Sequence, residues 1–216
     1  MALQLATLET ILWFNRNIVM LELWPKEIPL VVQIVMAIII GDFIPYWAHR
    51  ISHENSKVLW KLHRIHHSPK RIYWLNAARI HPINLAYSII LSLTPILILG
   101  AGKEVLFITG LITTLHSFAS HTNIDFRLGI LNWFFSMNEL HRWHHANNSK
   151  EGNTNYGGTT IIWDIVFGTR YLPPSKFNDH KVGLESYDDY SMNFKNHFGW
   201  QTQKAKRPKI NILEKY

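Results

Sequence analysis

Three long apolar segments place the strongest limit on how this chain can fold. The first, IPLVVQIVMAIIIGDFIPYWAHR from Ile28 to Arg50, is apolar for about twenty residues, enough for a helix to span the hydrocarbon core of a bilayer, and it contains one acid, Asp42. Two more runs begin at Ile83 and at Val105, and only GAGKE separates them. This pattern predicts a helical hairpin with a tight turn. The runs together predict an all-α fold, an integral membrane helical bundle.

The amino-terminal segment decides whether the bundle has three or four spans. LQLATLETILWFNRNIVMLELW is apolar but is interrupted by Glu9, Arg16 and Glu22, so it either spans the membrane or lies in the interface. Downstream, residues 122–216 are too polar to span, and LGILNWFFSM at 128–137 is short enough to predict an interfacial helix. The alternative is a soluble all-α protein with buried helices. Three separate runs of spanning length favour the membrane protein.

The distribution of positive charge predicts the orientation. The chain has a formal net charge of +7, which alone fits nucleic acid, an anionic membrane surface or an acidic partner. Seven lysines and arginines lie between the first and second apolar runs, whereas the hairpin turn offers only Lys103. The positive-inside rule therefore puts residues 50–82 on the cytoplasmic side, and the third run returns the rest of the chain to that face. We expect a cytoplasmic helical cap and no nucleic-acid partner, at a bacterial inner membrane or the endoplasmic reticulum.

Histidines gather at this same predicted face. LHRIHH at 62–67 returns as LHRWHH at 140–145, and the spacing of each set places its imidazoles close together on a helix. The candidate metal ligands are His49, His53, His63, His66, His67, His81, His121, His141, His144 and His145. Crowded imidazoles repel when protonated and lack partners when neutral, and metal coordination removes both costs. One ion accepts about six ligands, so this number of histidines predicts two ions.

Other metal chemistries fit the sequence less well. The absence of cysteine excludes thiolate sites and disulfides. HENSK at His53 has Lys57 where a zinc hydrolase would carry its second histidine, and the chain has no Glu-x-x-His pair. An all-histidine site for two ions at a membrane face remains.

The order of these motifs resembles the fatty acid hydroxylase and sterol desaturase superfamily. The segments DFIPYWAHRISH, LHRIHHSP, RIHP, SHTNI, LHRWHH and NYGGTTIIWDIVFGTRYLP are similar to its successive boxes over about Gly41 to Pro173. The resemblance implies a non-haem di-iron enzyme that uses O2 to hydroxylate or desaturate an unactivated C–H bond of a lipid. At 216 residues the chain is expected to form one domain over 1–216, with an amino-terminal interfacial or spanning helix at 1–27, the family core at 28–173 and a polar region at 174–216.

Several further residues are candidates for supporting roles. Asp42, Asn123, Asn155 and Asp164 could accept hydrogen bonds from the ligands, with ordinary loop or cap bonding as the alternative. Tyr46 and Trp163 could line the substrate path or anchor the protein at the interface. His81 could instead cap its helix, and His116 lies five residues before His121, so we leave it out of the ligand set. Asn84 stands where the family often has an acid.

Each turnover of such an enzyme needs two electrons, and the sequence has no nucleotide-binding glycine motif or cysteine cluster to supply them. An electron-transfer protein, a ferredoxin or haem carrier with its reductase, is therefore implied. An oligomer could complete the lipid tunnel. The competing hypothesis is a histidine-rich membrane protein that binds or transports metal without oxygenase activity. Transport would require ligands spread through the depth of the spans.

Overall fold

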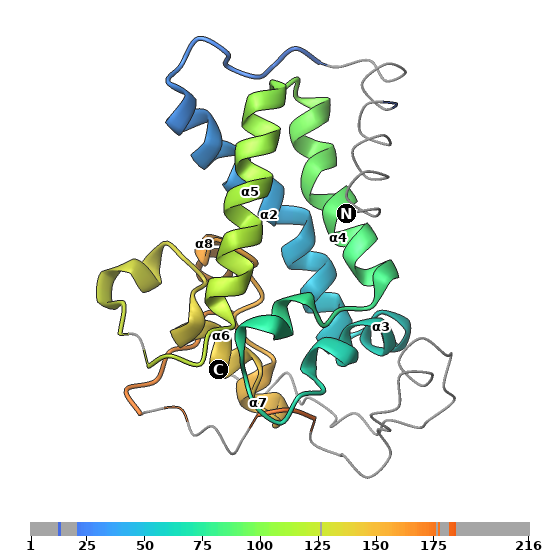
Figure 1. The fold of residues 1–216 in the computed structure, drawn as a ribbon, viewed down its shortest axis with the longest axis vertical. Coiled ribbons are helices and arrows are strands. Elements are labelled where there is room, and N and C mark those ends of the chain that lie inside the picture. Colours follow the sequence, from blue (N-terminus) through green and yellow to red (C-terminus); the bar gives the residue numbers. More distant parts are fainter. Residues whose placement is uncertain (1–12, 14–20, 126, 176, 178–181, 185–216) are drawn as a thin grey trace.

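The computed structural model describes residues 13, 21–125, 127–175, 177 and 182–184, and within them the chain is helical (Figure 1). Pairing between extended segments is limited there to isolated bridges at Phe135–Thr160 and Ala146–Val182. The elements in order are α2 (Leu30–Glu54), α3 (Lys57–His67), η1 (Trp74–Ala78), α4 (Pro82–Ile98), α5 (Lys103–Ser120), η2 (Gly129–Trp133), α6 (Asn138–His144), α7 (Ser149–Gly152) and α8 (Ile162–Val166). The all-α prediction is confirmed for this part of the chain.

Helices α2, α4 and α5 form a bundle at one end of the molecule (Figure 1). Helices α4 and α5 are the predicted hairpin, which turns at Gly100 with a φ of +90°. Among the described helices, only α2 is both long and apolar enough to cross a membrane, while α4 is apolar but has 17 residues. Three or four spans therefore stay a prediction. Large apolar side chains such as Val31, Phe107 and Leu115 face outward from the bundle.

The interior of the bundle is a small apolar core. Trp24, Ala37, Ile96, Ala101 and Val105 pack together at the end remote from the histidines. Close contact between α2 and α4 depends on Gly41, since a Cβ there would lie 3.0 Å from Ile96 Cδ1 and 3.1 Å from the Ser92 carbonyl oxygen. This contact between α2 and α4 sets the position of the last two turns of α2.

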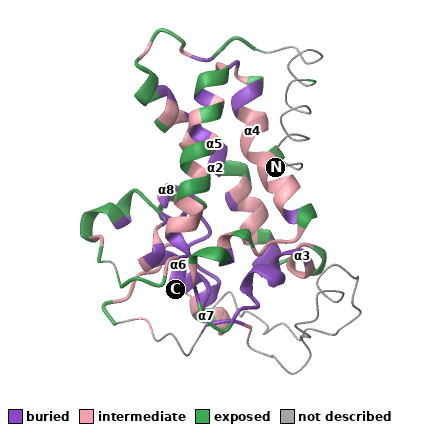
Figure 2. Cartoon of the chain, viewed as in Figure 1, coloured by how far each residue is buried: buried purple, intermediate pink, exposed green. Residues whose placement is uncertain are grey.

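The other end of the molecule is a cap of short helices and buried loop, shown mostly in purple in Figure 2. The loop between α7 and α8 is held by two acids. Asp42 Oδ2 in α2 accepts the backbone N–H groups of Thr159 and Thr160, at 2.8 and 2.7 Å. Asp164 in α8 accepts those of Tyr156 and Gly157, both at 2.7 Å. The cap is therefore tied directly to the bundle.

The interfacial helix predicted at 128–137 is not continuous. The structure has a five-residue 3₁₀ helix, η2, followed by an extended segment in which Phe135 pairs with Thr160. Gly129 has a φ of +54°, outside the helical range, and Asn132 and the Leu128 N–H are tied to Glu139 instead of to helical neighbours. The predictions for the amino-terminal segment at 1–27 and the polar region at 174–216 lie largely outside the described residues, which include 13, 21–27, 174, 175, 177 and 182–184 of these segments.

Candidate metal centre

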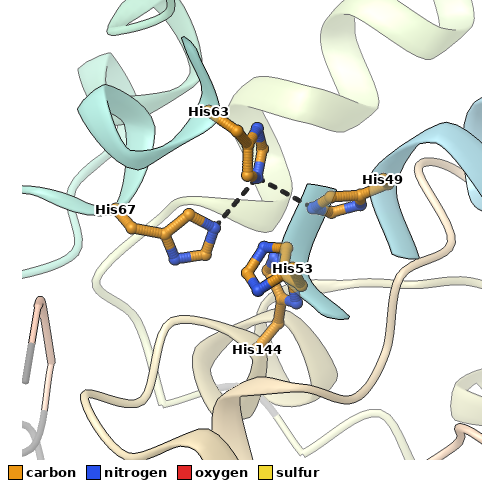
Figure 3. A group of neighbouring side chains, drawn as sticks. All are labelled: His49, His53, His63, His67 and His144. Atoms are coloured by element: carbon orange, nitrogen blue, oxygen red, sulfur yellow. Dashed lines mark hydrogen bonds between the residues drawn. The ribbon is translucent and has the colours of Figure 1, made fainter. Parts of the chain in front are cut away.

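Nine of the predicted histidines converge in the cap, in two groups. The first group is His49, His53, His63, His67 and His144 (Figure 3), and the second group is His66, His121, His141 and His145. In each group every histidine offers a ring nitrogen within 4.8 Å of the others. The groups adjoin, since the rings of His67 and His145 stack with their centroids 4.4 Å apart.

The geometry of the helices explains this division. Helix α2 delivers His49 and His53 to the first group from one face, because they are four residues apart. Helices α3 and α6 each contribute to both groups: His63 and His67 go one way and His66 the other, while His144 is separated from His141 and His145. Ser56 begins α3 by accepting the Leu59 N–H, which sets the rotation of that helix. His121 comes from the carboxyl end of α5.

The second nitrogen of most of these rings fixes the tautomer. The Nδ1–H groups of His49 and His144 donate to the carbonyl oxygens of Tyr156 and Thr154, each at 2.8 Å. His121 Nδ1–H donates to the Ser117 carbonyl oxygen at 2.7 Å. His63 and His53 donate in the same way to side-chain oxygens, of Asn84 at 2.9 Å and of Asn153 at 3.2 Å. A neutral imidazole that donates from Nδ1 presents a lone pair at Nε2.

These lone pairs face one another. His49 Nε2 lies 2.9 Å from His63 Nε2, and His121 Nε2 lies 2.9 Å from His141 Nε2. The first pair cannot form a hydrogen bond, because both rings hold their proton at Nδ1. Two nitrogens bound at right angles to one ion, each at about 2.1 Å, are about 3.0 Å apart. His53 Nε2 and His144 Nε2 are buried with no partner among the described residues. The donor set therefore fits a metal ion in each group.

Burial keeps the imidazoles neutral, as metal binding requires. Burial, and then the neighbouring imidazoles, lower the pKa of His67, of His141 and of His145 well below the usual value of 6.5. The same causes lower the pKa of His66, of His63 and of His144. For His63 and His144, the hydrogen bonds to Asn84 and to the Thr154 carbonyl oxygen offset part of this lowering of the pKa. Neutral imidazole binds iron, zinc, copper and nickel.

Of the histidines that the structure describes, two lie outside both groups. His81 precedes α4, and its Nδ1 accepts the Ile83 N–H, so it occupies the capping position that the His-Pro sequence suggested as an alternative. His116 lies in α5 and belongs to neither group; both of its ring nitrogens are buried without a hydrogen-bond partner among the described residues.

The proposed supporting residues have different partners from those expected. Asp42 and Asp164 bond backbone N–H groups and, for Asp164, also the Thr169 hydroxyl. Asn155 bonds the backbone of Leu140 and Tyr171, and Asn123 accepts from Arg142. Within the described chain, none of these four is hydrogen-bonded to a histidine of the groups. Asp42, Asn155 and Asp164 instead hold the loop whose carbonyl oxygens accept from His49 and His144.

Tyr46 and Trp163 are hydrogen-bonded side chains in the wall between α2 and α8. The Tyr46 hydroxyl lies 2.8 Å from Thr169 Oγ1 and is fully buried, and Trp163 Nε1 donates to the Ile39 carbonyl oxygen. Phe43 packs against Trp163, with ring centroids 4.7 Å apart. Their role on a substrate path stays a prediction.

Sequence reasoning missed the residues that orient the ligands. Asn84 was noted only as a departure from the family pattern, yet its side chain accepts the His63 Nδ1–H. Asn153, Thr154 and Tyr156 follow the third histidine box closely, but which histidines they serve depends on how the loop folds back. The Asn84 signal was present in the sequence, since an amide oxygen can take the place of a carboxylate oxygen.

Comparison with known proteins gives a consistent set of relatives. The family model for fatty acid hydroxylase matches residues 34–169. The chain is 40% identical to an ornithine lipid hydroxylase of Rhizobium tropici over 70% of its own length and 45% of that protein. It is 34% identical to human alkylglycerol monooxygenase, over 59% of this chain and 28% of that protein. A methylsterol monooxygenase of Arabidopsis thaliana is 28% identical, over 63% and 52%. The chain thus spans about half or less of these relatives. No solved structure matches it significantly.

Proposed function

Because the chain belongs to the fatty acid hydroxylase family, we propose that it is a membrane-bound non-haem di-iron oxygenase. It uses O2 and externally supplied electrons to hydroxylate or desaturate an unactivated C–H bond of a lipid. The observation that carries this proposal is the convergence of nine neutral histidines into groups of five and four with facing lone pairs. The named relatives act on ornithine lipid, alkylglycerol and methylsterol, which supports a lipid substrate.

The division of labour follows from the site. The first group would hold one iron ion and the second group the other, and the bound pair would supply the activation of O2 for attack on the C–H bond. The chain's own residues do the positioning. Asn84, Asn153 and the carbonyl oxygens of Thr154, Tyr156 and Ser117 hold the proton of each bonded imidazole at Nδ1, so that Nε2 stays available for the metal.

Two features favour an enzyme over a metal transporter. The histidines of both groups gather at one end of the bundle, whereas the core around Ala37, Ile96 and Val105 is apolar, and the described part of the chain has no further group of three or more metal-binding side chains. A transported ion would need polar positions along its path. The family relatives are also hydroxylases and monooxygenases.

The partners and location follow the same proposal. The α2, α4 and α5 bundle lies in the membrane, and the cap with its histidines lies on the cytoplasmic side, where a ferredoxin or haem carrier delivers electrons. Lys57 and Lys61 on α3 lie on the cap and would attract an acidic carrier.

The test is metal content together with oxidation. Full-length protein in detergent, loaded with ferrous iron without O2, should bind about two ions per chain. Given O2, a reduced ferredoxin and a bacterial lipid extract, it should add one oxygen atom from labelled O2 to a lipid or remove two hydrogens. Replacing His144→Ala should lower the iron content and abolish oxidation.

His116→Ala is the matched control, since this histidine lies in α5 with buried ring nitrogens but belongs to neither group. It should bind iron and oxidise lipid as the unmodified protein does. Iron bound normally with no lipid oxidised would favour the metal-binding alternative. Full activity of His144→Ala would remove the ligand assignment.

A further inference from the structure

A pocket of about 170 Å³ lies beside α6, and none of the nine histidines lines it. One wall is the segment that follows α5, with Ile124, Asp125 and Arg127, and the other is α6, with Glu139 and Arg142. The remaining wall comes from Leu172, Pro173, Ser175 and Phe177. The pocket therefore shares α6 with the candidate metal centre.

Arg142 is the unusual residue of this pocket. Arg142 is 8% exposed, and its Nη2 donates one long hydrogen bond of 3.3 Å to Asn123 Oδ1. Among the described residues, its buried Nε–H has no acceptor and no carboxylate lies within ion-pair distance of the guanidinium. A buried guanidinium without an acid is costly, and its planar set of donors fits a phosphate or a carboxylate.

The charges around Arg142 select the kind of anion. Arg127 adds a second positive charge, and Asp125 and Glu139 add two negative charges, so the formal charge of the lining cancels. Glu139 is already engaged, because its Oε2 accepts the Leu128 N–H and the Asn132 side chain. A free phosphate dianion gains no net attraction from such a lining. A headgroup with an amine beside its anion finds a partner for each charge.

The chain between the two pocket walls points to a lipid. It contains η2 and carries exposed large apolar side chains: Ile130, Leu131, Trp133, Phe134 and Phe135. Figure 2 shows this segment in green, projecting to one side of the cap. The Arg170 guanidinium lies over the Trp133 ring, 4.1 Å from its centroid. Exposed aromatic residues beside arginines are typical of the membrane interface. Headgroup-binding charges and an acyl-chain surface thus lie side by side.

We propose that the pocket formed by Ile124, Asp125, Arg127 and α6 binds the zwitterionic headgroup of a membrane lipid. Arg142 binds the phosphate or carboxylate of that headgroup, and Asp125 faces its amine. The apolar surface of η2 contacts the acyl chains. Under the function proposed above, this lipid is the substrate, and Arg142 is a substrate-positioning residue carried on the same helix as His141 and His144.

Binding to the metal-free, full-length protein in detergent tests the pocket without any oxidation. The probes are dihexanoyl phosphatidylethanolamine, which has an amine, dihexanoyl phosphatidylglycerol, which has none, and inorganic phosphate, each titrated by calorimetry. The ethanolamine lipid should bind most tightly. Arg142→Gln should weaken its binding about ten-fold or more, because a buried charge-assisted hydrogen bond is lost. Asp125→Asn should weaken the binding of the ethanolamine lipid and leave the binding of the glycerol lipid unchanged.

Arg71→Gln is the matched control, an exposed arginine that lies against Tyr73 outside the pocket, and it should bind all three probes as the unmodified protein does. Equal binding of phosphate and both lipids would overturn the proposal, as would unchanged lipid binding in a folded Arg142→Gln variant. If that variant does not fold, an Asp125→Asn variant that binds both lipids as before overturns it. These experiments measure lipid binding and no oxidation. A negative result would therefore count against the headgroup pocket and not against the di-iron oxygenase activity.

Discussion

At the scale of single residues, the site depends on which ring nitrogen of each histidine carries the proton, as well as on which histidines are present. Five histidines donate Nδ1–H to fixed oxygen atoms, and their Nε2 lone pairs point inward as a result. Three of those oxygens belong to the backbone, so mutation of the accepting residue's side chain does not remove them. Asn84 and Asn153 are the exceptions, and they make the orientation of His63 and His53 accessible to mutation.

Replacing Asn84→Leu should weaken metal binding about ten- to a hundred-fold, because His63 loses the acceptor that holds its ring and tautomer. Asn84→Asp should restore binding, since a carboxylate also accepts the Nδ1–H. The measurement is competition for the bound metal with a chelator of known affinity. Ser88→Ala, which removes only the hydroxyl that Asn84 Nδ2 contacts, should have little effect.

The convergence of the histidines could be predicted from the sequence, but the residues that orient them could not. His-x-x-His-His spacing places side chains on one helical turn wherever that turn lies, so local geometry was sufficient. The supports His49–Tyr156 and His63–Asn84 join residues 107 and 21 positions apart. Such pairs depend on how the loop and α4 pack against α2 and α3, which no local spacing records. Asp42 shows the same limit, because it faces the cap but binds backbone.

At the scale of elements, the loop between α7 and α8 is the part of the cap that the two acids organise. Asp42 and Asp164 between them accept four consecutive or near-consecutive backbone N–H groups, of Tyr156, Gly157, Thr159 and Thr160. The Tyr156 carbonyl in the same loop receives the His49 Nδ1–H. A shift of this loop therefore changes a ligand as well as the fold.

Gly157→Ala should destabilise the protein by about 2 kcal/mol or more, because overpacking forces the backbone to move. The added Cβ would lie 2.1 Å from the Thr160 carbonyl oxygen and 2.8 Å from Asp164 Oδ2. Thermal unfolding in detergent measures the change, and metal content should fall with it. Gly110→Ala in α5 is the control: nothing lies within 4 Å of its Cβ, so stability should hold or rise. Equal stability of the two variants would contradict the close contact.

The long helices were predictable and the short ones were not. The apolar runs predicted α2, α4 and α5, because a run of that length fits only one regular element and GAGKE permits only a turn. The 128–137 segment has similar composition but folds as η2 and an extended strand-like end. There Gly129 and the bonds to Glu139 compete with helix formation, and the apolar side chains have no helical face to share.

At the scale of the whole molecule, polarity is divided along the long axis. The bundle end has an apolar core and outward-facing apolar side chains, while the cap end contains the buried histidines, asparagines and acids. The low mean hydropathy of −0.04 comes from averaging over these two parts. A bilayer around the bundle would leave the cap at one surface.

Single cysteines test this orientation directly, because the chain has none of its own. Lys103→Cys at the α4–α5 turn should react with a membrane-impermeant maleimide in intact bacterial cells. Lys150→Cys on α7 should react only after the cells are opened. Both lysines are exposed, so accessibility within the protein is matched. Labelling of both positions from the same side would exclude the hairpin as a pair of spans.

Acid should destabilise the metal-free protein. The pKa values of His67, His141 and His145 are well below 6.5 because they are buried among other imidazoles. Below pH 6.5 the unfolded chain takes up protons that the folded cap does not, so stability falls by about 1.4 kcal/mol per pH unit for each such histidine. Asp164 opposes this, since burial raises its pKa to about 6 and its contribution grows as pH falls.

Thermal unfolding of the metal-free protein in detergent at pH 7.5 and pH 5.5 measures this balance. The unfolding temperature should be clearly lower at pH 5.5, because the effect of several buried histidines outweighs that of Asp164. An unchanged or higher unfolding temperature at pH 5.5 would show that the imidazoles are not held neutral.

The sharing of α3 and α6 between the two groups has a thermodynamic consequence. An ion bound in the first group would immobilise the turns that also carry His66, His141 and His145. Binding of the second ion would then cost less conformational entropy. By thermodynamic reciprocity, each ion would then raise the affinity of the protein for the other ion. Chains carrying a solitary ion would be scarce at any degree of loading, and iron starvation would divide a population into filled and empty molecules.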